Sequence, residues 1–321
     1  MNKKAKLFIS VPDDRHLDSR RQSLKRSIIA FIQDSGFEVI GFESEQWGVT
    51  TPPLLNDWSV ERASALLRRC DGAVVLGLAR SHVHVLKPGI KARSKTTLIS
   101  QPQPTPYNHL EGGLAISLGL PVLILLEEDM DRSGLFASGI KPSIIPKNVA
   151  EQWVNSSSFT NHFNAWAAVV CGRRDVFLGY CSKASPVAME IRDYLENNNF
   201  SVVDWSRDFK PSGATILEEI ERASERCRSG IFLFTKDDEI QNISTGKASF
   251  DAIPRDNVLL EAGFFTRSHG KGRIAIIREA GAKMPADFGG IIYISFNDRS
   301  DLVAAKEKLI VFLTEALGRG D

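Results

Sequence analysis

The chain has 321 residues, which is enough for two domains of ordinary size. Its apolar content of 43%, charged content of 25% and net charge of +1 are typical of a soluble globular protein and exclude a chain dominated by disorder or by basic nucleic-acid-binding surface. We therefore expect no nucleic-acid partner, and no membrane partner either, since the longest apolar runs, such as residues 120–126, are too short to cross a bilayer.

The first half of the chain is predicted to alternate strands and helices. Short apolar runs are typical of buried strands, and apolar residues at helical spacing predict the helices between them. In chain order we expect a strand at residues 7–11, a helix at 19–35, a strand at 37–42, a helix at 58–69, a strand at 73–78, a helix at 108–118, a further strand, and a final helix with Phe159, Phe163, Trp166 and Val170 on one face. A basic insertion at residues 79–106 ends in a proline-rich run, so we expect it to lie outside the sheet.

The second half repeats this order. Helix-spaced apolar residues followed by a strand-like run occur twice with no change of spacing: Leu24, Ile28, Phe31 and Ile32 before residues 37–40, and Val187, Ile191, Tyr194 and Leu195 before residues 200–203. The predicted elements are a strand at 176–180, a helix from 185, a strand at 202–203, a helix at 214–226, a strand at 231–234, a helix from 255, and strands at 274–277 and 291–294. This repetition indicates one fold used twice.

Strands and helices that alternate at this spacing favour parallel sheets covered on both faces. The predicted fold class is therefore α/β, with two tandem flavodoxin-like or Rossmann-like sandwiches. We expect one domain at residues 1–170 and a second at residues 175–321. Ligands of such sheets bind at the carboxyl ends of the strands. In the second domain these ends carry Gly179, Tyr180, Asp204, Trp205 and Thr235.

Five segments of the second domain stand in the order of a known family. They are VFLGY from Val176, KPSGATILEEIE from Lys210, LFTKDDE from Leu233, RDNVLLEAGFF from Arg255 and MPADFGGIIYI from Met284. In this order they resemble the bacterial TIR-like nucleotide-binding domains found in effectors of cyclic-oligonucleotide anti-phage systems. The resemblance covers the whole second domain. It implies cleavage of NAD⁺ at the nicotinamide–ribose bond, with NAD⁺ as the substrate and no resident cofactor.

The resemblance places the catalytic carboxylate at Glu261. Loss of nicotinamide leaves an oxocarbenium-like ribose, as in glycoside hydrolysis, and the leaving group departs neutral from a cationic ground state. No general acid is then required, and one carboxylate near the ribose can stabilise the developing positive charge. The alternative is a carboxylate that stabilises the helix N-terminus or forms a salt bridge. Because Glu261 lies in an apolar segment, burial without a partner would raise its pKa.

Further residues are candidates for holding the substrate. Tyr180 and Trp205 follow the first two strands of the domain, where a nicotinamide or adenine ring can stack on them. The remaining candidates are Gly179 at the first strand end, the hydrogen-bonding residues Ser182, Asp204, Arg207 and Asn257, and Ser212 in a loop that often gates such sites. The alternative interpretation is that the two aromatic side chains only pack at the edge of the sheet and that the loop residues only form ordinary turns. We expect no metal site and interpret Asp237 and Asp238 as a solvated strand-end loop.

The first half carries a related candidate. Glu111 stands near the start of a helix after the third strand, as Glu261 does, and Asn108 precedes it. The segment is similar to nucleoside 2-deoxyribosyltransferase-like proteins, but it lacks the Arg-Asp-Asn lead-in and the paired aspartates of the second half. Three interpretations are open: a degenerate copy that senses a nucleotide signal and controls oligomerisation, an assembly module without a ligand, and a second glycosidase or transferase site that uses Glu111 and Asn108.

The resemblance leads us to expect an NAD⁺ nucleosidase that serves as an effector in bacterial anti-phage defence. We expect activation by a nucleotide signal, with a cyclic nucleotide second messenger as a candidate partner, and by self-association into a homo-oligomer. The alternatives are a non-catalytic nucleotide-binding TIR adaptor and a nucleoside-processing glycosidase that uses the first domain. The N-terminal segment does not read as a secretory leader and the four cysteines show no C-x-x-C spacing, so we expect a reducing, cytoplasmic location.

Overall fold

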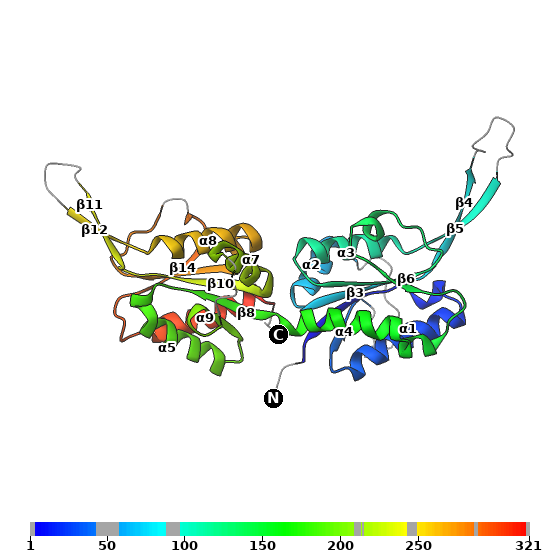
Figure 1. The fold of residues 1–321 in the computed structure, drawn as a ribbon, viewed down its shortest axis with the longest axis horizontal. Helices are drawn as coiled ribbons and strands as arrows, with labels where there is room; N and C mark the ends of the chain where they lie inside the picture. The colour runs from blue at the N-terminus through cyan, green and yellow to red at the C-terminus, as the bar shows by residue number, and fades with distance from the viewer. Residues whose placement is uncertain are drawn as a thin grey trace. The chain divides into compact units, whose positions relative to one another are not determined.

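The computed structural model describes residues 4–42, 58–87, 97–208, 213, 215–242, 249–285 and 288–318. The chain divides into two compact units, Met1–Cys171 and Gly172–Asp321, which we call the N-terminal unit and the C-terminal unit. Within each unit, helices cover both faces of a five-stranded sheet (Figure 1).

The N-terminal unit is built on a sheet with the strand order β2-β1-β3-β6-β7, in which neighbouring strands are parallel. Its strands are β1 (Lys6–Ser10), β2 (Glu38–Ile40), β3 (Gly72–Gly77), β6 (Val122–Glu127) and β7 (Ser143–Ile145), and its helices are α1 (Ser19–Asp34), α2 (Val60–Arg68), α3 (Pro106–Ser117) and α4 (Ser157–Gly172). Phe8 of β1 packs with α2 and α3, whereas Leu7 and Ile9 pack with α1 and α4. This alternation buries both faces of the sheet.

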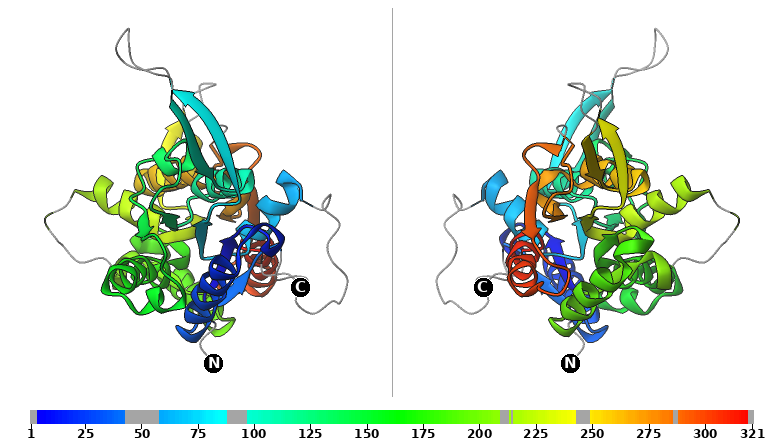
Figure 2. Two further views of the ribbon diagram at one scale, coloured as in Figure 1. Left: turned by 90° about the vertical axis from the view of Figure 1, so that its right-hand side faces the viewer. Right: turned by 90° about the vertical axis from the view of Figure 1, so that its left-hand side faces the viewer.

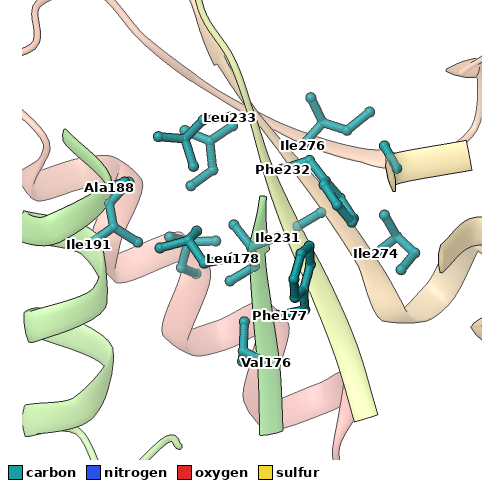
Figure 3. Packing of buried hydrophobic residues seen from close by; sticks show 14 of the residues in the cluster. Val176, Phe177, Leu178, Ala188, Ile191, Ile231, Phe232, Leu233, Ile274 and Ile276 are labelled. Carbon is teal, nitrogen blue, oxygen red and sulfur yellow. The ribbon is translucent and has the colours of Figure 1, made fainter. Parts of the chain in front are cut away.

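The C-terminal unit has the strand order β14-β13-β10-β8-β9, again with parallel neighbours. Its strands are β8 (Arg174–Gly179), β9 (Val202–Asp204), β10 (Cys227–Phe234), β13 (Ile274–Glu279) and β14 (Ile292–Phe296), and its helices are α5 (Ser185–Asn197), α6 (Trp205–Asp208), α7 (Ile216–Arg226), α8 (Asp256–His269) and α9 (Val303–Ala316). Figure 3 shows Leu178 on the side of the sheet that faces Ala188 and Ile191 of α5, with Phe177 and Phe232 on the other side. The Phe177 ring stacks on Phe265 of α8 at a centroid distance of 4.7 Å.

The two sheets have the same strand order when each is read along its own part of the chain. In both, the second strand lies at one edge next to the first, followed by the third, fourth and fifth in the main sheet. This order, 2-1-3-4-5, is that of flavodoxin-like folds, whose ligands bind where the order reverses, between the first and third strands. The predicted fold class of two tandem parallel α/β sandwiches is confirmed, and the reversal in the C-terminal unit falls between β8 and β10.

Each unit also carries an antiparallel hairpin between its third strand and the helix that follows. The hairpins are β4 (Ser81–Lys87) with β5 (Thr97–Gln103) and β11 (Asp238–Asn242) with β12 (Ser249–Ile253). Each extends away from the sheet of its own unit (Figures 1 and 2). The described part of the basic insertion thus lies outside the sheet as predicted and forms a hairpin, in which Pro102 pairs with His82 in a ribbon that has only edge strands. The β11–β12 hairpin was not predicted.

Short 3₁₀ turns connect several of these elements. They are η1 (Asp14–His16), η3 (Gly134–Ala137), η4 (Glu151–Asn155), η5 (Ser182–Ala184) and η6 (Lys271–Arg273). Across the described parts of the chain, none of the helices combines the length and the apolar character that a bilayer span requires.

Candidate active site

A buried aspartate links the start of α8 to the end of β10 by hydrogen bonds. Asp237 accepts a hydrogen bond from the Thr235 hydroxyl at 2.6 Å and a second from the backbone N–H of Arg255, the N-cap residue of α8, at 3.2 Å. Arg255 also forms a 3.2 Å ion pair with Asp238. These contacts fix where α8 begins relative to the sheet, and therefore where Glu261 lies.

The interpretation of Asp237 as part of a solvated loop is wrong, because the residue is only 4% exposed and its carboxylate accepts hydrogen bonds from two donors. Sequence reasoning missed this positioning role, since the partner Arg255 follows only after the β11–β12 hairpin. Among the described residues no group of three or more His, Cys, Asp or Glu side chains is arranged to hold a metal ion.

Glu261 lies one turn into α8, at the reversal point between β8 and β10. Its residue exposure is 5%, and its Oε1 accepts a hydrogen bond from the indole N–H of Trp205 at 2.9 Å. Its Oε2 is buried and has no hydrogen-bond partner in the part of the chain that the structure describes. The carboxylate therefore has one oxygen held by a hydrogen bond and one buried oxygen that makes no hydrogen bond within the described structure.

Gly179, at the end of β8, provides the space that this free oxygen occupies. A Cβ atom at position 179 would lie 2.7 Å from Oε2 of Glu261 and 2.5 Å from Cδ1 of Phe232. Both distances are shorter than a van der Waals contact, so only glycine fits here without moving the carboxylate. The prediction that the end of the first strand belongs to the site thus has a steric basis.

Burial raises the pKa of the Glu261 carboxyl to about 8, and the hydrogen bond from Trp205 offsets only part of this rise. The alternative interpretation of Glu261 as one member of a salt bridge finds no support, because none of the ion pairs between described residues includes it. A buried carboxylate without a cation is unusual and is more typical of functional sites than of structural ones. A ligand that carries or develops positive charge would favour its ionised form.

Tyr180 and Asp204 lie beside Trp205 but are bonded to each other. The Tyr180 hydroxyl donates to Oδ1 of Asp204 at 2.7 Å, and Asp204 also accepts from the Ser206 backbone N–H at 2.8 Å and from Arg192 Nη1 at 3.1 Å. Burial alone would raise the pKa of Asp204, but hydrogen bonds from Tyr180 and Ser206 outweigh it and hold that pKa below the usual value. These hydrogen bonds stabilise the turn that positions Trp205. Contact of Tyr180 or Asp204 with a ligand stays a prediction.

Three other predicted residues lie on the surface. Arg207 donates to the Glu196 carboxylate and to the Val202 carbonyl, whereas Ser182 and Asn257 are exposed. No hydrogen bond between described residues joins any of the three to Glu261. Ser212, together with Lys210, lies outside the described residues. The structure therefore brings together Glu261, Trp205 and Gly179.

The predicted residues of the first half are also buried. Glu111 is 5% exposed, and its Oε1 accepts from the indole N–H of Trp58 at 2.9 Å. Asn108 has no exposed surface, and its Nδ2 donates to the Ser10 hydroxyl at 2.8 Å. Trp58 was not singled out as a site residue, because residues 43–57 separate it from the strand that precedes it and its partner is distant in sequence.

Replacing Trp205 by phenylalanine is expected to raise the pKa of Glu261 further above about 8, because the substitution removes the hydrogen bond that favours the ionised form. The measurement is a ¹³C NMR titration of the Glu261 carboxyl carbon in the full chain. Trp166→Phe is the matched control, since the Trp166 indole N–H has no hydrogen-bond partner among the described residues. An ordinary carboxyl titration near pH 4.5 in the unsubstituted protein would contradict this description of the site.

Comparison with known proteins identifies the type of domain that holds this site. Residues 175–298 match the family described as CAP12/Pycsar effector protein, TIR domain. The Pycsar effector protein PaPycTIR of Pseudomonas aeruginosa is 28% identical over 123 residues, which are 38% of this chain and 39% of that protein. CD-NTase-associated protein 12 of Flavobacterium daejeonense is 32% identical over 125 residues, 38% of this chain and 37% of that protein. The chain thus spans about two fifths of the length of these curated relatives.

Among solved structures, the Clostridium botulinum CMP N-glycosidase BcmB aligns with 47% of this chain and 95% of its own, at 15% identity and a TM-score of 0.28. That score is too low to support any conclusion about shared fold or activity.

Proposed function

Because residues 175–298 form a bacterial TIR domain of the type found in CAP12 and Pycsar effectors, we propose that the protein is an NAD⁺ nucleosidase that acts as an effector in anti-phage defence. The observation that carries this proposal is the carboxylate of Glu261, which is buried at the strand-order reversal with no cation beside it in the described structure.

The proposed reaction uses the positive charge that the substrate supplies. The bond between ribose C1′ and the nicotinamide nitrogen breaks with both electrons on nitrogen, so nicotinamide leaves neutral and the charge moves to the ribose. The ionised carboxylate of Glu261 stabilises this oxocarbenium-like ribose, with Trp205 holding one of its oxygens so that the other faces the sugar. Water then adds to C1′ and releases a proton, which gives nicotinamide and ADP-ribose. Addition of an adenine nitrogen in place of water gives a cyclised product.

The buried position of Oε2 supports the proposal that activity is regulated. A substrate ribose cannot reach an oxygen that is buried, so the neighbourhood of Trp205 has to open before the reaction begins. Binding of a cyclic nucleotide second messenger, followed by self-association of the chain, would supply the free energy for this opening. We therefore expect a single chain to have low activity.

The test is an NAD⁺ consumption assay with the full chain. Protein alone, protein at high concentration, and protein with cyclic mononucleotides or cyclic dinucleotides are incubated with NAD⁺, and nicotinamide and ADP-ribose are quantified by chromatography. We expect one nicotinamide released for each NAD⁺ lost. Saturable NAD⁺ binding with no turnover under any of these conditions would instead support the non-catalytic adaptor.

A further inference from the structure

The N-terminal unit contains a second buried carboxylate, Glu111, at the position that corresponds to Glu261. The helices α3 and α8 occupy corresponding places, with N-cap residues Thr105 and Arg255, and Glu111 and Glu261 follow these caps at the same spacing. Each carboxylate is 5% exposed, and each accepts an indole N–H at 2.9 Å. The repetition therefore extends from the fold to the environment of one side chain.

The two indoles come from different places in the repeat. Trp205 follows β9 directly, and the strand pairings put Phe42, after β2, at the corresponding position. Phenylalanine has no N–H, and the donor in the N-terminal unit is Trp58, which precedes α2 and lies 6.3 Å from Phe42 between ring centroids. Because non-equivalent residues make the same contact, duplication of the chain alone does not account for it.

The N-terminal unit differs in the residues beside the carboxylate. Ser10 stands where the C-terminal unit has Gly179, and Asn108 stands where it has Val258. Asn108 Nδ2 donates to the Ser10 hydroxyl at 2.8 Å and to the Ser10 carbonyl at 3.2 Å. Asn108 Oδ1 is buried with no hydrogen-bond partner among the described residues. A buried acceptor without a donor is costly, so a donor from a ligand would be favourable at this position.

An aromatic surface lies next to these polar groups. The rings of Trp58 and Tyr107 are 4.9 Å apart between centroids, and Tyr107 is 37% exposed. An exposed ring beside buried hydrogen-bond acceptors is suited to a flat base joined to a hydroxyl-bearing sugar. We propose that the N-terminal unit binds a ligand with a nucleoside moiety without cleaving it. Because Glu111 and Asn108 Oδ1 are buried, the surroundings of Trp58 have to open on binding. The sugar hydroxyls then donate to these two acceptors, and the base stacks on Tyr107.

Free nucleosides, mononucleotides and cyclic nucleotides can all make the ring-stacking and hydroxyl contacts, so the test measures binding of each of these three ligand classes separately. Full-length Glu261→Gln protein is titrated by isothermal calorimetry with adenosine, cytidine, guanosine and uridine, then with the corresponding monophosphates and cyclic nucleotides. We expect saturable binding of at least one probe. Glu111→Gln in the same background is expected to weaken that binding at least tenfold, and Tyr107→Ala, at an exposed position, at least threefold. Leu110→Ala, on the exposed side of α3, is the matched control and should leave binding unchanged.

Three results would overturn the proposal: no saturable binding of any probe by folded protein, binding that both Glu111→Gln and Tyr107→Ala leave unchanged, and release of free base from a nucleoside by a Glu111-dependent reaction. Binding unaffected by these substitutions would lie outside the proposed site. Because every titration uses Glu261→Gln protein, the outcome does not depend on whether the C-terminal unit cleaves NAD⁺.

Discussion

Replacing Glu261 by glutamine is expected to lower the rate of NAD⁺ cleavage by about 10²- to 10³-fold, the usual effect of removing one group that stabilises transition-state charge. Glutamine has the same shape and still accepts the Trp205 N–H, but it cannot ionise. The loss should appear in kcat, because the carboxylate acts on a charge that develops at C1′ only as nicotinamide leaves. Nicotinamide release under activating conditions is the measurement.

Glu221→Gln is the control for this substitution, since Glu221 is exposed on α7 and belongs to no part of the proposed site. Thermal unfolding of both variants separates a chemical effect from a folding defect. Equal turnover by the unsubstituted protein and Glu261→Gln would show that Glu261 is not the catalytic carboxylate. Loss of turnover in Glu111→Gln but not in Glu261→Gln would show that the reaction takes place in the N-terminal unit.

Replacing Gly179 by alanine is expected to reduce NAD⁺ cleavage by about 10²-fold, because the new Cβ would lie 2.7 Å from Oε2 of Glu261 and force the carboxylate away from its place. The same Cβ would lie 2.5 Å from a Phe232 ring carbon, so we also expect a loss of about 1–3 kcal/mol in the free energy of unfolding. Activity and denaturant unfolding are measured on the same preparation.

Gly263→Ala is the matched control for Gly179→Ala. Gly263 lies in α8 two positions after Glu261, and apart from its chain neighbours and the backbone of its own helix a Cβ there would meet no described atom within 4 Å. Alanine in place of glycine inside a helix should raise the free energy of unfolding by about 0.5–1 kcal/mol and leave turnover unchanged. If Gly179→Ala folds and cleaves NAD⁺ at the unsubstituted rate, the position assigned to the reacting ribose is wrong.

Much of the architecture could be predicted because it depends on local patterns. Apolar runs and helical spacing indicated both sheets, and the repetition between residues 24–40 and 187–203 indicated their shared topology. The β11–β12 hairpin gave no such signal, because Asp238–Asn242 is mostly polar and Ser249–Ile253 has only five residues. Pairing of two short strands depends on backbone hydrogen bonds, to which side-chain periodicity is a poor guide.

The candidate site was predicted less completely than the fold. The position of Glu261 followed from a resemblance and from its place after the third strand. Its bond to Trp205, the space left by Gly179 and the burial of Asp237 each depend on residues brought together from separate strands and helices. Trp205 was predicted to stack on a substrate ring. The structure shows its N–H bonded to Glu261, which only the side-chain orientation reveals.

The pH dependence of kcat/KM for nicotinamide release is the most direct test of the central claim, because it reports the ionisation of catalytic groups in the free enzyme. Burial raises the pKa of Glu261 to about 8 in the free protein, and the ionised form is the active one, so kcat/KM should rise about tenfold per pH unit up to pH 7 and level off above pH 8. This rise should be absent from the residual activity of Glu261→Gln. A profile that is flat between pH 6 and pH 9, or that persists in Glu261→Gln, would contradict the assignment of Glu261 as the group that stabilises the cationic ribose.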